Sequence, residues 1–90
     1  MPLITLVVNH PAGLHARPAA LFVKMAKTFP CNITIRRLDS EKPPVSAKNI
    51  LGVLTLGVNQ GYSIEIEAQG EGAETALQSL KKLVESDFTE

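Results

Sequence analysis

Apolar residues recur at the spacing of one helical face in two parts of the chain. One part runs from Pro18 to about Thr28, and the other follows Gly70 and Gly72 and continues towards the C-terminus. The apolar positions are Ala19, Phe22, Val23, Ala26 and Phe29 in the first part and Ala73, Ala76, Leu77, Leu80, Leu83 and Val84 in the second. Residues three and four apart lie on the same side of a helix, so each part is predicted to be an amphipathic helix that buries one face.

Short apolar runs with a different period predict strands before and between these helices. Tyr62–Ala68 alternates apolar and polar residues, which is typical of a strand with one buried and one wet face. Leu3–Val8 and Asn32–Leu38 are rich in β-forming residues, and we expect Leu3–Val8 to be a buried strand. The polar stretch 39–44 contains two prolines, which do not fit a central strand, so it is predicted to be a turn that leads into a very short strand at Val45–Ala47.

The stretch from Asn49 to Leu56 permits two interpretations. It can form a short helix that Asn49 caps and Gly57 closes, because these residue types favour the two ends of a helix. In that helix the residues facing the core are Val53 and Leu56, and those left at least partly exposed are Ile50, Leu51 and Leu54. An exposed apolar cluster of this kind often marks a docking surface. The alternative is that ILGVLTL is a buried strand or a wholly buried helix, which periodicity alone does not exclude.

The order of the predicted elements is strand, helix, strand, short strand, short helix, strand, helix. Strands with one wet face, accompanied by few helices, favour an antiparallel sheet with helices on one side. We therefore predict an α+β fold, a two-layer open-faced sandwich in which three helices cover one side of a four-stranded antiparallel sheet (βαββαβα). Residues 1–90 are expected to form a single domain with a modest core and little room for a deep cleft.

Composition and charge exclude nucleic acid as a partner. Nine Lys and Arg balance nine Asp and Glu, and the chain has one Tyr, three Phe and no Trp. It therefore lacks the basic face or the stacking platform that nucleic-acid binding needs.

The cysteine and histidine content limits the other chemistry. Cys31 is the only cysteine, so it is expected to be a small buried residue without a disulfide, in a reducing compartment. No metal site is expected, because His10 and His15 are the only histidines, and His10 is expected to be an exposed loop side chain. No stretch approaches the roughly 20 apolar residues of a membrane span, and the N-terminus lacks a cleavable leader pattern, so we expect a cytoplasmic protein.

The stretch GLHARPAA, from Gly13 to Ala20, brings together groups that suit an anion. Pro18 fits only near the start of a helix because it has no backbone N–H, which places His15 at or just before the first turn. The backbone N–H groups of Ala16 and Arg17, the positive end of the helix dipole and the Arg17 guanidinium would converge beside the imidazole. A nucleophile next to such an anion site indicates phosphoryl transfer. The alternative is that His15 only caps the helix or lies on the surface and that Arg17 is an ordinary solvated charge.

A second stretch, AKNILGVLTLG from Ala47 to Gly57, accompanies GLHARPAA in a chain with this order of elements. Together they resemble the second signature and the phosphorylation-site motif of the HPr family. Its members are the histidine-containing phosphocarrier proteins of the bacterial phosphoenolpyruvate-dependent sugar phosphotransferase system. The resemblance spans essentially the whole chain, and the two motifs at this separation are far more specific than either alone.

The resemblance implies a phosphoryl shuttle that needs no cofactor. Enzyme I, charged by phosphoenolpyruvate, would phosphorylate His15 on Nδ1, and His15 would pass the group to the IIA domain of a sugar permease. Arg17 and the backbone N–H groups of Ala16 and Arg17 would hold the phosphoryl oxygens. The apolar residues that would be exposed and dock these partners are Leu14, Ala16, Ala20, Ile50, Leu51 and Leu54. The protein would be a carrier rather than an enzyme, would not insert into a membrane and is expected to be monomeric.

Two features depart from the family pattern, and other functions stay open. Many members carry a regulatory serine three residues before the first glycine of the second motif, where this chain has Asn49, so that regulation is expected to be absent; Ser46 is out of register. The segment Leu38–Pro44 is longer than the family's usual tight turn.

One alternative function is a regulatory, nitrogen-related phosphorelay, with which the missing serine and the final SDF segment are compatible. The other is an interaction module that binds partners through Ile50, Leu51 and Leu54 without being phosphorylated.

Overall fold

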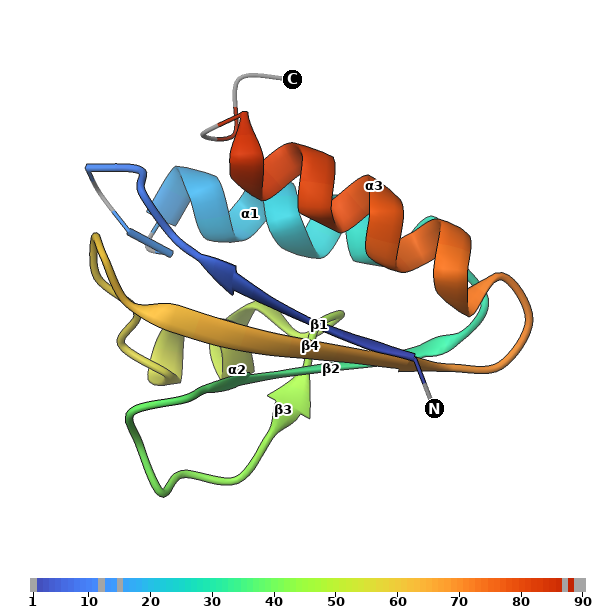
Figure 1. The fold of residues 1–90 in the computed structure, drawn as a ribbon, viewed down its shortest axis with the longest axis horizontal. Helices are drawn as coiled ribbons and strands as arrows, with labels where there is room; N and C mark the ends of the chain where they lie inside the picture. Colours follow the sequence, from blue (N-terminus) through green and yellow to red (C-terminus); the bar gives the residue numbers. More distant parts are fainter. Residues whose placement is uncertain (1, 12, 15, 87, 89–90) are drawn as a thin grey trace.

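The computed structural model describes residues 2–11, 13–14, 16–86 and 88, and it has the strands and helices in the predicted order (Figure 1). The elements are β1 (Leu3–Val7), α1 (Ala16–Ala26), β2 (Asn32–Arg37), β3 (Val45–Ser46), α2 (Ile50–Thr55), β4 (Ser63–Gln69) and α3 (Ala73–Glu85). The sequence predicted that the first helix starts at Pro18, and α1 begins two residues earlier, at Ala16. Proline fits there because every N–H of the first helical turn lacks an intrahelical partner, so Pro18 removes no helical hydrogen bond.

The four strands form one antiparallel sheet in the order β1-β4-β2-β3. β4 lies inside the sheet, where Ile66 is opposite Ile4 of β1 on one side and Ile35 of β2 on the other. α1 and α3 run along the same face of the sheet (Figure 1), and α2 packs against α1 and β3. The predicted α+β fold, a two-layer open-faced sandwich, is therefore confirmed.

The core lies between the sheet and the helices. In β4 the side chains of Ile64, Ile66 and Ala68 are fully buried, as the alternation predicts. The helices contribute the predicted stripes, whose buried members are Ala19, Phe22, Val23 and Ala26 of α1 and Ala73, Ala76, Leu77, Leu80, Leu83 and Val84 of α3. Each large side chain buried in this way contributes roughly 1.5–3 kcal/mol to the free energy of folding. The sheet and the two long helices therefore form a stable scaffold for the loops at their ends.

The expectation that the first strand is buried is wrong. β1 is an edge strand, and Leu3 and Val7 expose 49% and 47% of their surface. The reason is that β1 pairs with β4 alone and that the helices cover one face of the sheet, so alternate side chains of β1 face solvent. An apolar run reports that a strand forms, but it does not report the position of that strand in the sheet.

The interpretation of residues 49–56 as a helix is confirmed. The Asn49 side chain caps α2, because its Oδ1 accepts a hydrogen bond from Gly52 N at 3.2 Å. Gly57 follows the helix with a φ of 64°, the left-handed conformation that glycine adopts at a helix end. Val53 and Leu56 are buried, as predicted, and α2 therefore has one face in the core and one face outside it.

Two further expectations concern single features. Cys31 is a buried free cysteine, which confirms its assignment as a small core residue. Within the part of the chain that the structure describes, none of the helices has both the length and the apolar character needed to cross a bilayer.

Candidate functional site

The loop that precedes His15 is held against the segment that follows α2. Gly13 has a φ of 63°, and a Cβ added to it would lie 2.4 Å from the carbonyl oxygen of Val58 and 2.7 Å from Cα of Asn59. The next residue, Leu14, donates its backbone N–H to the same Val58 oxygen at 2.9 Å. Glycine is therefore required at position 13 both by its backbone conformation and by the close approach of another backbone segment.

Further hydrogen bonds hold the start of this loop. Val8 N donates to Tyr62 O at 2.9 Å, and Gly61 N donates back to Val8 O at 2.6 Å. The Gln60 side chain adds a hydrogen bond from Nε2 to Asn9 O at 3.1 Å. The described residues of the loop before His15 and residues 58–62 thus fix each other's backbone.

The expectation that His10 is an exposed loop side chain is wrong. Its imidazole is partly buried and contacts the ring of Phe88 edge-on, with 5.8 Å between the ring centroids. Phe88 is buried and its N–H donates to Leu83 O at the end of α3. The segment after α3 therefore folds back onto the loop at His10, a long-range contact that no local pattern reveals.

The expected anion site lies at the first turn of α1. The helix begins at Ala16, directly after His15 in the chain, and Arg17 is an exposed residue of the first turn. The backbone N–H groups of Ala16 and Arg17 belong to the first turn, whose donors have no carbonyl partner within the helix. His15 itself and the side chain of Ala16 lie outside the described residues, so the roles assigned to them stay predictions.

The expectation that Leu14 belongs to the exposed docking surface is wrong. Its side chain is fully buried in the core. The left-handed turn at Gly13 and the hydrogen bond from Leu14 N to Val58 O direct this residue inwards. Leu14 therefore anchors the site loop to the core and does not present an apolar surface to a partner.

The remaining apolar residues form a candidate docking patch on two neighbouring helices. On α2, Leu51 is 71% exposed, Ile50 is 37% exposed and Leu54 is partly buried against the core. Ala20 is exposed on α1, which packs against α2. We call Ala20, Ile50, Leu51 and Leu54 the docking patch. Exposed apolar side chains on neighbouring elements suit a binding surface, and docking of partners at these four residues stays a prediction.

Basic residues outside α2 hold its carboxyl end, and the sequence analysis did not find them. Arg37 donates from Nη1 to the carbonyl oxygens of Leu56 and Gly57 at 3.0 and 3.1 Å. Lys42 donates from Nζ to Thr55 O at 2.8 Å. One signal was available: in β2 the buried residues are Ile33 and Ile35, so Arg37 occupies the next inward-facing position, where a charge needs a partner.

The neighbouring arginine has a different environment. Arg36 donates from Nε to Glu65 Oε1 at 2.9 Å, from β2 to β4. The hydrogen bond to Glu65 and the charge of that carboxylate raise the pKa of Arg36 above its ordinary value. Arg36 and Arg37 therefore have unrelated contacts although they are adjacent in one strand.

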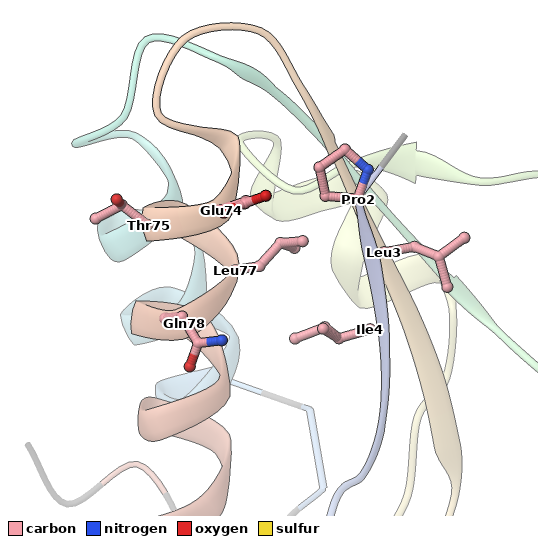
Figure 2. Close-up of a pocket in the computed structure, with 7 residues that line it drawn as sticks. All are labelled: Pro2, Leu3, Ile4, Glu74, Thr75, Leu77 and Gln78. Carbon is pink, nitrogen blue, oxygen red and sulfur yellow. The ribbon is translucent and has the colours of Figure 1, made fainter.

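One cavity on the scaffold is lined by residues of β1 and α3 and by none of α1. It has a volume of about 450 Å³ and is open between β1 and the first half of α3. In Figure 2, the side chains of Ile4 and Leu77 point towards each other across it, and Glu74 is its acidic residue. Among the residues that the structure describes, no three His, Cys, Asp or Glu side chains are grouped as a metal site requires.

Comparisons with known proteins agree with this geometry. A family model described as "PTS HPr component phosphorylation site" matches residues 4–86. The phosphocarrier protein HPr of Streptomyces coelicolor is 44% identical over 83 residues, which cover 92% of this chain and 87% of that protein. The multiphosphoryl transfer protein of Haemophilus influenzae is 38% identical over 86 residues, but this chain spans only 17% of that protein's length.

The solved structures give the same result. A crystal structure of HPr from Thermoanaerobacter tengcongensis is 40% identical, covers 100% of this chain and 98% of its own, and has a TM-score of 0.92. A structure described as an HPr dimer from the same organism also covers the whole chain, with a TM-score of 0.76. The family model, the relatives and the shared fold agree, and the chain therefore belongs to the HPr family of phosphocarrier proteins of the phosphotransferase system.

Proposed function

We propose that His15 is the residue that carries the phosphoryl group. Nδ1 of a neutral imidazole would form the new bond to phosphorus. At the same time the bond from phosphorus to the donor, phosphorylated enzyme I, would break, and its electron pair would stay with enzyme I. The IIA domain of a sugar permease would then remove the group in the same way. The observation that carries this proposal is that α1 begins at Ala16, the residue that follows His15 in the chain, because the first-turn N–H groups of a helix have no carbonyl partner within the helix.

The same helix tip supplies the groups that would stabilise the transferred phosphoryl group. The backbone N–H groups of Ala16 and Arg17 and the Arg17 guanidinium can donate charge-assisted hydrogen bonds to its oxygens. Arg17 is exposed, so these contacts leave the phosphoryl group open to a second protein. A carrier must be charged by one partner and discharged by another, and an open helix tip meets that requirement better than a closed pocket.

The docking patch and the charge of α1 favour partners with an apolar and acidic surface. Helix α1 contains no acidic residue, and Arg17 and Lys24 are exposed on it, with exposed Lys27 directly after it. These cations lie on the helix that packs against α2 and its exposed Leu51. Complementary charge of this kind raises the rate of association, so we expect transfer to slow as the salt concentration rises.

We also propose that this protein is a carrier without an enzymatic activity of its own, that it acts in the cytoplasm and that it is monomeric. Size-exclusion chromatography with light scattering measures the last property directly. Asn49 stands at the position of the family's regulatory serine and caps α2 with its side-chain oxygen. Because an amide has no hydroxyl to phosphorylate, we propose that this route of regulation is absent.

The test is phosphorylation followed by intact-mass spectrometry at neutral to alkaline pH, after incubation with phosphoenolpyruvate and enzyme I. We expect a gain of one phosphoryl group that mild acid removes. His15→Ala should abolish the gain and His10→Ala, the matched control at the other histidine, should preserve it. Which enzyme I homologue charges the protein separates the sugar branch from the regulatory branch. Partner binding without any phosphorylation, unchanged in His15→Ala, would replace the carrier function with that of an interaction module.

A further inference from the structure

Arg37 contacts four residues, two at the carboxyl end of α2 and two elsewhere in the fold. Its Nη1 donates to Leu56 O and Gly57 O, and its guanidinium carbon lies 5.0 Å from the centroid of the Tyr62 ring. Its Nε forms an ion pair with Asp39 Oδ1 at 2.7 Å, and 22% of its side chain is exposed. A guanidinium is planar and has five N–H donors, so it can hold several partners in a fixed geometry at once.

Helix α2 depends on such contacts because it is very short. It contains six residues, far fewer than an isolated helix needs to be stable in water. Its last carbonyl groups have no N–H partner further along the helix. Arg37 satisfies the carbonyls of Leu56 and Gly57, and it brings a positive charge to the negative end of the helix dipole.

The residue after this contact belongs to the backbone that supports the site loop. Gly57 is followed by Val58, whose carbonyl oxygen accepts the N–H of Leu14, the residue directly before His15. The added Cβ at Gly57 would lie 3.4 Å from Arg37 Nη1, so the arginine also packs closely on the turn itself. The docking patch on α2 and the loop before His15 therefore meet at a segment whose carbonyls Arg37 holds.

We propose that Arg37 is a positioning residue, which fixes the docking patch of α2 relative to the loop that carries His15. It touches neither the phosphoryl group nor the partner, and it acts by keeping the end of α2 and the turn at 56–58 in one arrangement. The role of Arg37 in transfer depends on the proposed function, because it assumes that partners dock on α2 while His15 reacts.

The kinetic test compares two neighbouring arginines. Arg37→Met and Arg36→Met remove the same charge from the same strand, but Arg36 is paired with Glu65 and has no described contact with α2. Initial rates of phosphorylation by enzyme I are measured against carrier concentration, well below the melting temperature of each variant. Arg37→Met should raise KM about fivefold and leave kcat within about twofold of the wild type, whereas Arg36→Met should change KM less than about twofold.

A conservative variant and an amide measurement separate positioning from a loss of folding. Arg37→Lys keeps the charge but lacks the planar group, so its KM should lie between those of Arg37→Met and the wild type. Backbone amide hydrogen exchange, measured without any partner, should show faster exchange at Leu14 and Gly57 in Arg37→Met, with little change at Ile66 in the central strand. A purely structural role would instead speed exchange in β4 as well and leave KM unchanged.

The outcomes of the two measurements are distinct. If the wild type accepts no phosphoryl group, the proposed function fails, and the exchange measurement alone then decides whether Arg37 fixes this segment. If the wild type is active and Arg37→Met matches Arg36→Met in both KM and exchange, Arg37 has no positioning role. Full activity of Arg37→Met with unchanged exchange at Leu14 would also overturn the proposal.

Discussion

Substituting Gly13 by alanine should destabilise the protein far more than a glycine substitution usually does. Two separate terms contribute. The left-handed conformation at a φ of 63° costs an alanine roughly 1–2 kcal/mol. The new Cβ would also lie 2.4 Å from Val58 O and 2.7 Å from Asn59 Cα. Both are backbone atoms that cannot rotate away, and crowding of this kind adds about 1–3 kcal/mol. The expected loss is therefore about 2–5 kcal/mol.

Gly61 provides the matched control in the loop that faces this position. It has a φ of 88°, but among the described residues no atom beyond its two chain neighbours lies within 4 Å of an added Cβ, so Gly61→Ala should lose only the conformational term, roughly 1–2 kcal/mol. Chemical denaturation gives the free energy of unfolding for each variant. Thermal melting should place Gly13→Ala at least about 4 °C below Gly61→Ala, because 1 kcal/mol shifts the melting temperature of a domain this small by about 4–8 °C.

The result that refutes this reasoning is equal stability of the two variants. It would mean that the contact between Gly13 and residues 58–59 relaxes freely and does not fix the loop before His15. If the contact is rigid, Gly13→Ala should also weaken the hydrogen bond from Leu14 N to Val58 O, and the Leu14 amide should then exchange faster than in Gly61→Ala.

Three further substitutions test the assignment of residues around the site. Arg17→Ala should slow phosphoryl transfer about 10- to 1000-fold while shifting the melting temperature little, because the side chain is exposed, and single-turnover kinetics beside a melting curve would show it. Leu51→Glu should weaken binding to enzyme I by about 1–3 kcal/mol without unfolding the protein, since Leu51 is 71% exposed; unchanged affinity in calorimetry would remove α2 from the docking surface. Leu14→Ala should lower the free energy of unfolding by about 2–5 kcal/mol because Leu14 is fully buried, and a variant as stable as the wild type in denaturant would contradict the burial of this side chain.

The elements of this fold could be predicted from the sequence because each has a local signature. The alternation in β4 and the stripe in α3 depend on residues a few positions apart, and the caps of α2 depend on Asn49 and Gly57 alone. The position of β1 at the sheet edge has no such signature, because it is set by pairing with β4 far along the chain. The same distinction applies to the site. The exposure of Leu51 could be predicted, because it follows from helical spacing, which is local.

Two features of the site depended on contacts between distant segments, and the sequence did not reveal them. Leu14 belongs to the motif GLHARPAA, in which we expected it to be exposed. Its contacts through Gly13 and Val58 instead direct it into the core. In the sequence Arg37 is one of several scattered charges, at the end of a strand, but its acceptors are carbonyl groups of residues 56 and 57. Carbonyl groups are present at every residue, so a sequence contains no sign of which of them a cation will reach.

The pairing of β1 with β4 also determines when the site can form during synthesis. Leu3 pairs with Glu67, and the loop after β1 donates hydrogen bonds to Val58 and Tyr62 and accepts them from Gln60 and Gly61. The loop that leads to GLHARPAA therefore forms its hydrogen bonds to residues 58–62 only after more than half of the chain has been made, and contacts between residues so far apart form slowly. A chain interrupted before residue 58 would contain the whole phosphorylation motif without the backbone that shapes it.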